Sequence, residues 1–151
     1  MRLYLDTSVF GGYFEPEFEA WTKRLFERVM SGDHIVLYSS LAKLELIGAP
    51  PRARELAEGL PIGLVEAVEL TDEARRLALE YVHARVVGAT SLPDCQHIAM
   101  ATLVHADVLV SWNFKHIVNV PRIRGYNSVN HRLGHPMLDI RTPIELMSDG
   151  N

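Results

Sequence analysis

The chain lacks the features that mark secreted and membrane-embedded proteins. It has 151 residues and a single cysteine, Cys95, so it cannot form an intrachain disulfide, and nothing else indicates an oxidising compartment. No apolar run approaches the roughly 18 residues that a membrane span needs. Asp6 interrupts the apolar start of the chain well before a secretory core is complete. We therefore expect a cytoplasmic protein without a membrane partner.

An excess of positive charge is also missing. Fifteen Lys and Arg stand against nineteen Asp and Glu, a formal net charge of -4, so a nucleic acid has to be met by a local patch. The stretch between Asp107 and Asp139 has no acidic residue, and we expect a basic C-terminal segment from about residue 114. Its cations can approach a phosphate backbone or pair with acidic helices elsewhere, and composition leaves both open. They are Lys115, Arg122, Arg124 and Arg132.

Apolar residues of two spacings alternate along the chain. Short continuous runs at 3–5, 35–38 and 108–110 are typical of strands buried on both faces of a parallel sheet. Longer segments have helical spacing, and Pro50-Pro51 separates two shorter helices. These expected helices span 18–30, 41–48, 52–59, 71–82 and 95–106. With 48% apolar residues, the alternation predicts a single three-layer α/β domain over residues 1–151.

Two carboxylates occur where carboxylates are costly. Asp6 directly follows the first predicted strand, and the carboxyl ends of parallel strands form the rim at which ligands bind. Capping of the next helix is the alternative role for Asp6. Glu45 lies between Leu41 and Ala42 on the apolar side of a helix that Ser39 is expected to cap. It needs a cation or hydrogen-bond donors there, unless the helix lies at the surface with Glu45 at the border of its buried stripe.

Chain direction connects Asp94 and Asn113 to the same rim. Ser91-Leu92-Pro93-Asp94 has the form of a capping box, which by itself gives Asp94 a structural role. The helix that it opens leads into the strand at 108–110, and helices between parallel strands run opposite to them. This helix should therefore begin near the rim that carries Asp6 and Asn113, so that three acids and one amide converge.

Converging carboxylates raise one another's pKa unless a divalent cation lies between them. Oxygen ligands favour Mg²⁺ or Mn²⁺ over zinc, and Mg²⁺ completes its shell with water and substrate phosphate. The sequence has no P-loop, no nucleophile elbow and no His-Glu-x-x-His motif. We therefore predict metal-assisted phosphoryl chemistry at the rim.

Four segments of the chain occur in a characteristic order: Leu3-Tyr4-Leu5-Asp6-Thr7-Ser8, Lys43-Leu44-Glu45-Leu46, Pro93-Asp94-Cys95-Gln96-His97-Ile98-Ala99 and Ala106-Asp107-Val108-Leu109-Val110-Ser111-Trp112-Asn113. Together, over residues 1 to about 120, they resemble a PIN domain of the VapC-like type. The resemblance implies a Rossmann-like parallel sheet flanked by helices, an acidic cluster that binds Mg²⁺ or Mn²⁺, and hydrolysis of RNA that leaves a 5′-phosphate and a 3′-hydroxyl. It also implies three partners, namely RNA, a cognate antitoxin and a second copy of the chain.

By this resemblance Asp6, Glu45 and Asp94 are metal ligands and catalytic residues. The fourth acidic position falls on Asn113, which keeps an oxygen but loses a charge. Weak binding of a second metal, orientation of water or phosphate, and low activity are the alternatives for Asn113. The expected function is a metal-dependent endoribonuclease, the toxin of a toxin-antitoxin pair. The alternative is a PIN-like RNA-binding or protein-interaction module with weak or no catalysis.

The acid-free stretch provides the expected RNA contacts, Lys115, Arg122 and Arg124. We expect residues 122–127 to form a loop that meets RNA phosphate and a stacked base. Neutralising Arg122 and Arg124 should then flatten the salt dependence of RNA binding.

Two residues near Asp94 in the sequence, His97 and Cys95, could have either a functional or a structural role. His97 follows it by three residues and is either a ligand in a mixed site or, as we favour, a core residue packed beside Ala101 and Val104. Cys95 has no basic neighbour in sequence to activate it, so we expect a small buried residue and not a nucleophile.

Overall fold

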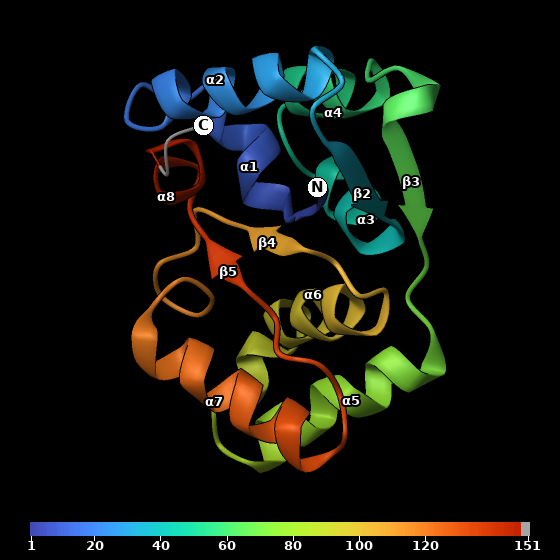
Figure 1. The fold of residues 1–151 in the computed structure, drawn as a ribbon, viewed down its shortest axis with the longest axis vertical. Coiled ribbons are helices and arrows are strands. Elements are labelled where there is room, and N and C mark those ends of the chain that lie inside the picture. Colours follow the sequence, from blue (N-terminus) through green and yellow to red (C-terminus); the bar gives the residue numbers. More distant parts are fainter. Residues whose placement is uncertain (149–151) are drawn as a thin grey trace.

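The computed structural model describes residues 1–148, which contain a five-stranded parallel sheet of order β3-β2-β1-β4-β5 (Figure 1). Three strands occupy the predicted apolar runs: β1 (Arg2–Leu5), β2 (Ile35–Ser39) and β4 (Val108–Val110). The other two, β3 (Val65–Val68) and β5 (Ile140–Arg141), lie at the edges and were not expected. All four pairings are parallel, as the alternation of strands and helices predicts.

Helices cover both faces of the sheet and make three layers (Figure 1). One face carries α1 (Thr7–Gly12), α2 (Glu19–Met30), α4 (Pro51–Glu58) and α8 (Pro143–Ser148). The other carries α5 (Asp72–His83), α6 (Leu92–Leu103) and α7 (Val120–Arg132). The helix α3 (Ser40–Ile47) follows β2 directly, and short 3₁₀ turns occupy Ile62–Leu64 and Ala89–Ser91. None of the helices described is long and apolar enough to cross a membrane.

The pleat of β1 divides the core between these two layers. Leu3 and Leu5 point into the cluster that packs on α1 and α2, whereas Tyr4 points into the cluster on α5 and α6. All three side chains are fully buried. The central strand therefore delivers a phenol to the layer that contains Asp94 and leaves Asp6 at its carboxyl end.

The prediction of a loop at residues 122–127 is wrong, because these residues lie within α7. The side chain of Asn119 accepts a hydrogen bond from the backbone N–H of Arg122 at 3.1 Å and starts the helix, and Pro121 fits its first turn. Gly125 permits close packing here, since a Cβ atom would lie 2.7 Å from Cγ1 of Val86. The basic segment is therefore largely helical and packed, and only some of its side chains can meet a ligand.

The strand order reverses at β1. The chain runs from β1 through β2 to β3 on one side and then from β4 to β5 on the other. In sheets of this type ligands bind in the crevice at the carboxyl ends of the strands beside such a reversal. We call the corresponding region here, between the segments that follow β1 and β4, the crevice. The backbone N–H of Asp6 donates there to the carbonyl of Val110 at 3.2 Å.

Candidate active site

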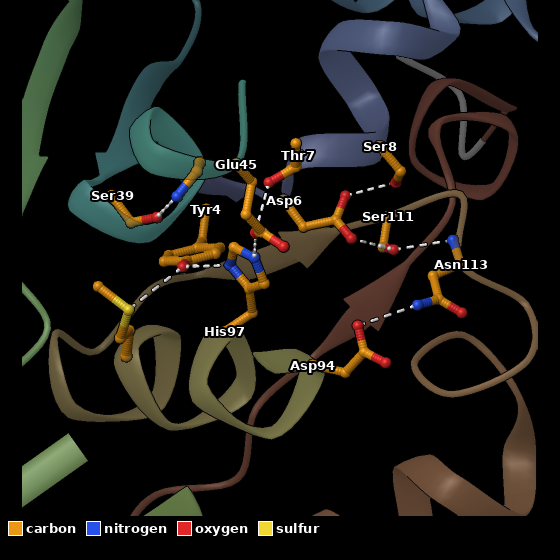
Figure 2. Close-up of polar contacts among 12 residues, drawn as sticks. Tyr4, Asp6, Thr7, Ser8, Ser39, Glu45, Asp94, His97, Ser111 and Asn113 are labelled. Carbon is orange, nitrogen blue, oxygen red and sulfur yellow. Dashed lines mark hydrogen bonds and ion pairs between the residues drawn. The ribbon is translucent and has the colours of Figure 1, made fainter. Parts of the chain in front are cut away.

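Asp6 lies at the centre of the crevice, and serine hydroxyls from both neighbouring segments fix its carboxylate (Figure 2). Ser8 donates to Oδ1 at 2.5 Å and Ser111 donates to Oδ2 at 2.7 Å. The backbone N–H groups of Trp112 and Asn113 donate in turn to the two serine hydroxyls, each at 2.9 Å. Neither serine was predicted to contact Asp6, although each is a polar residue shortly after a predicted strand.

The carboxyl groups of Asp6 and Asp94 lie close enough to affect each other's charge. Burial raises the pKa of Asp6 above its ordinary value, and the negative charge of Asp94 adds to this, despite the opposing effects of His97 and the two serines. Burial also raises the pKa of Asp94, with a further contribution from Glu45. Electrostatic interactions therefore link Asp94 on α6 to Asp6, which directly follows β1, and to Glu45 on α3.

Asp94 is held by Asn113 and not by a cap. Nδ2 of Asn113 donates to Oδ1 of Asp94 at 3.2 Å, and Oδ1 of Asn113 accepts from the backbone N–H of His116 at 3.0 Å. The predicted capping box is wrong, because Ser91 makes no side-chain cap at the start of α6. Asn113 thus presents a donor to the acids and turns its oxygen toward its own segment, which favours a positioning role over that of an oxygen ligand.

Glu45 lies at the border of the buried face of α3, with 35% of its side chain exposed. The helix starts as predicted, since Ser39 accepts from the backbone N–H of Ala42 at 2.9 Å. Oε1 of Glu45 is bonded to Thr7 Oγ1 at 2.8 Å and to His97 Nε2 at 2.6 Å. Burial raises the pKa of Glu45, but the hydrogen bonds of His97 and Thr7 outweigh it and hold this pKa below its ordinary value. Glu45 therefore ionises more readily than an ordinary glutamate.

His97 and Cys95 are both buried on α6, but only His97 is hydrogen-bonded to other residues of the site. His97 is buried as expected, but it bonds Glu45 and Tyr4 rather than merely filling space beside Ala101 and Val104. Cys95 is fully buried, and burial raises the pKa of its thiol to about 12. The prediction that Cys95 is a small buried residue is confirmed.

The predicted RNA contacts lie in different surroundings. Lys115 is exposed two residues after Asn113, and Arg124 is exposed on α7. The guanidinium of Arg122 donates to the backbone carbonyl of Val86, which ties α7 to the segment after α5. Lys115 and Arg124 are therefore the better placed of the three to meet an anionic ligand.

The donor chemistry of the crevice fits a hard divalent cation. Among residues 1–148, no group of three or more His, Cys, Asp or Glu side chains is arranged tightly enough to hold a metal. Mg²⁺, however, is usually held by one or two carboxylates together with water and substrate phosphate. Asp6 and Asp94 offer such a pair. Burial raises the pKa of both, with added repulsion from Asp94 on Asp6 and from Glu45 on Asp94, and a cation would relieve this cost. Oε2 of Glu45 also has no hydrogen-bond partner in this part of the chain.

Comparisons with known proteins show a likeness of fold. No family model matches the chain, and no curated protein matches it. Among solved structures, a chain of VapBC2 from Rickettsia felis aligns with a TM-score of 0.57 and 14% identity. That structure holds VapBC2 bound to a DNA fragment from the VapBC2 promoter. The alignment covers 94% of this chain and 98% of that chain. The fold prediction is confirmed, since the chain has a PIN-like α/β fold.

Two further structures support the same fold. A toxin-antitoxin complex from Klebsiella pneumoniae aligns with a TM-score of 0.54 and 16% identity, covering 80% of this chain and 93% of that chain. FitAcB from Neisseria gonorrhoeae aligns with a TM-score of 0.53 and 12% identity, covering 93% and 97%. At such identities the likeness concerns the fold alone.

Replacing Asn113 by Asp tests the electrostatics of the crevice. In chelator the variant loses a hydrogen bond to a charged group and gains a second carboxylate beside Asp94, so we expect a loss of about 1.5–3 kcal/mol in the free energy of unfolding. Adding Mn²⁺ should recover most of this loss. Urea denaturation in both buffers measures it, and Asn113→Ala, which lacks the extra charge, should gain far less from Mn²⁺. An Asn113→Asp variant as stable as the parent in chelator would contradict the arrangement.

Proposed function

We propose that this chain is a metal-dependent endoribonuclease that hydrolyses phosphodiester bonds in RNA. The observation that carries the proposal is the approach of Asp6, Glu45 and Asp94 at the crevice beside the strand reversal. Carboxylate oxygens at this part of a parallel sheet suit a Mg²⁺- or Mn²⁺-assisted reaction of a phosphate. The PIN-like fold is consistent with the same function.

Each side chain has a role in this proposal. Asp6 and Asp94 hold the cation, which when bound polarises the phosphate and lowers the pKa of water. Glu45 would complete the acidic cluster around the cation. Hydrogen bonds to Thr7 and His97 hold its Oε1, so Oε2 remains to face the cation and to accept a hydrogen bond from the attacking water. Asn113 fixes the direction of the Asp94 carboxylate through Nδ2. The serines fix Asp6 in the same way.

Replacing Asp6 by Asn separates catalysis from stability. Loss of the cation's charge stabilisation, several kcal/mol, lowers cleavage of RNA by roughly 10³-fold or more. Because the folded protein raises the pKa of Asp6 above 3.8, ionisation of Asp6 destabilises the metal-free fold as pH rises through the raised pKa. Asp6→Asn should therefore be more stable than the parent at neutral pH in chelator, and this difference should shrink as pH falls toward 3.8.

Nuclease assays on mixed RNA and chemical denaturation across pH measure the two effects. Gln96→Ala, a substitution in α6 that removes none of the three acids, serves as a control and should leave cleavage near the parental rate. Full cleavage by Asp6→Asn would end the proposal.

A PIN-like RNA-binding or interaction module is the second candidate. It is favoured by Asn113, which replaces a carboxylate of the expected set, and by the finding that no group of three ligating side chains gathers within residues 1–148. Calorimetry with Mn²⁺ and a cleavage assay with and without chelator separate the candidates. RNA binding without Mn²⁺ binding or cleavage identifies the module.

RNA contact by Lys115 and Arg124 is a further part of the proposal. Each phosphate contact removed lowers the slope of log K against log salt by about 0.7 for a single strand. We expect Lys115→Gln and Arg124→Gln together to flatten that slope by roughly twice this amount. Fluorescence anisotropy with labelled RNA on the Asp6→Asn background measures it. Arg52→Gln, in the opposite layer, is the matched control, and an unchanged slope in the double variant refutes the contacts.

We also propose that the chain is the toxin of a toxin-antitoxin pair, works in the cytoplasm and forms a homodimer. The proposal is supported by the fold it shares with chains of toxin-antitoxin complexes. Near the site, Leu44 and Ile47 of α3 are 65% and 64% exposed, as a protein contact would require. Light scattering should give twice the chain mass of 17.0 kDa, and the product of an adjacent reading frame should co-purify and suppress cleavage. A monomer with no such partner contradicts both assignments.

A further inference from the structure

His97 is a buried titratable side chain to which the proposed reaction gives no direct role. It lies one turn after Asp94 on α6, and only 3% of its side chain is exposed. Both ring nitrogens are engaged (Figure 2). Nδ1 lies 2.7 Å from the hydroxyl of Tyr4 on β1, and Nε2 lies 2.6 Å from Oε1 of Glu45 on α3. One imidazole therefore joins α6 and α3, which carry Asp94 and Glu45, to β1, which Asp6 directly follows.

The partners fix the proton arrangement of this chain of hydrogen bonds. An ionised carboxylate only accepts, so Nε2 of His97 carries the proton that it shares with Glu45. The phenol of Tyr4 is fully buried, and burial raises its pKa far above the ordinary value, so it keeps its proton and can donate to Nδ1 when His97 is neutral. The hydroxyl also lies 3.6 Å from the sulfur of Met100. With both nitrogens used in this way, His97 has no lone pair for a metal.

Glu45 needs such a partner more than Asp6 does. It projects from a helix at the surface, with 35% of its side chain exposed, whereas Asp6 is enclosed by two serines. A free glutamate side chain loses up to about 2 kcal/mol of rotamer entropy when it is held in one place. His97 and Thr7 both bond Oε1, and they leave Oε2 as the oxygen available to the crevice.

We propose that His97 is a positioning residue, oriented by Tyr4, that holds the Glu45 carboxylate in the direction required for metal and water. The inference rests on the proposed function, because it gives Glu45 its role there. Groups that orient metal-binding side chains in this way typically change metal affinity or activity 10- to 100-fold when they are replaced. Tyr4 acts through His97, since its hydroxyl orients the His97 ring and makes no hydrogen bond to any of the three acids.

The test uses three variants in the full chain, with calorimetric Mn²⁺ binding as the first readout and RNA cleavage as the second. His97→Leu removes the donor and should weaken Mn²⁺ binding and lower kcat by 10- to 100-fold, with KM for RNA nearly unchanged. His97→Gln places an amide N–H where Nε2 lies and should recover most of the loss. Tyr4→Phe should cause a smaller loss of the same kind. On a Glu45→Gln background, His97→Leu should have no further effect on Mn²⁺ affinity.

Thr102→Val is the matched control. Thr102 is buried on the same helix and accepts a hydrogen bond from Asn130 at 3.2 Å, so the variant disturbs α6 without touching Glu45. It should lower the melting temperature and leave Mn²⁺ affinity unchanged. If His97→Leu only follows this pattern, or if His97→Gln recovers nothing, His97 is structural and the inference is overturned.

The failure of this inference differs from the failure of the proposed function. If the parent protein binds Mn²⁺ and cleaves RNA while His97→Leu stays within twofold of it in both readouts, only the inference is wrong. If the parent binds no Mn²⁺ and cleaves no RNA, the proposed function fails and the role of His97 fails with it.

Discussion

The buried carboxylate of Asp6 is the constraint on which the rest of the site depends. It ends the central strand, and the segments after β1 and β4 are folded so that Ser8 and Ser111 donate to it. An ionised carboxylate is costly to bury even with two donors, and the raised pKa of Asp6 records that cost. A perturbed acid in the crevice at a strand reversal is typical of a functional site.

The three acids are in different electrostatic states, and this difference supports different roles. Burial raises the pKa values of Asp6 and Asp94, and the charge of a neighbouring acid adds to each shift, so this pair gains most from a bound cation. For Glu45, the hydrogen bonds of His97 and Thr7 outweigh burial and lower the pKa. Glu45 therefore carries its charge whether or not a cation is present, as an acceptor for water requires. Environments that separate the pKa values of neighbouring acids commonly accompany a division of catalytic roles.

The sequence predicts the parts of the fold that depend on local pattern. Strands β1, β2 and β4 are continuous apolar runs, whereas β3 has two exposed residues and β5 has two residues in all. Helix α7 was not predicted, because Gly125 is a weak helix former in the middle of the segment. Asn119 followed by Pro121 is nevertheless a helix start signal. Chain direction alone was enough to bring Asp6 and Asp94 together. The partners of these acids could not be predicted, because hydrogen bonds such as that from Ser111 to Asp6 join residues 105 positions apart.

The link between Glu45 and His97 follows from topology once the sheet is known. Helix α3 leaves the rim after β2, and α6 starts at the rim because it leads into β4, so both run away from the same edge. Glu45 is the sixth residue of α3 and His97 the sixth residue of α6, so each lies about 7.5 Å along its helix axis from the first residue, at 1.5 Å per residue. Tyr4 precedes Asp6 by two residues, about 6.6 Å along the strand. The three side chains therefore share one level below the rim, where an imidazole can bridge a phenol and a carboxylate.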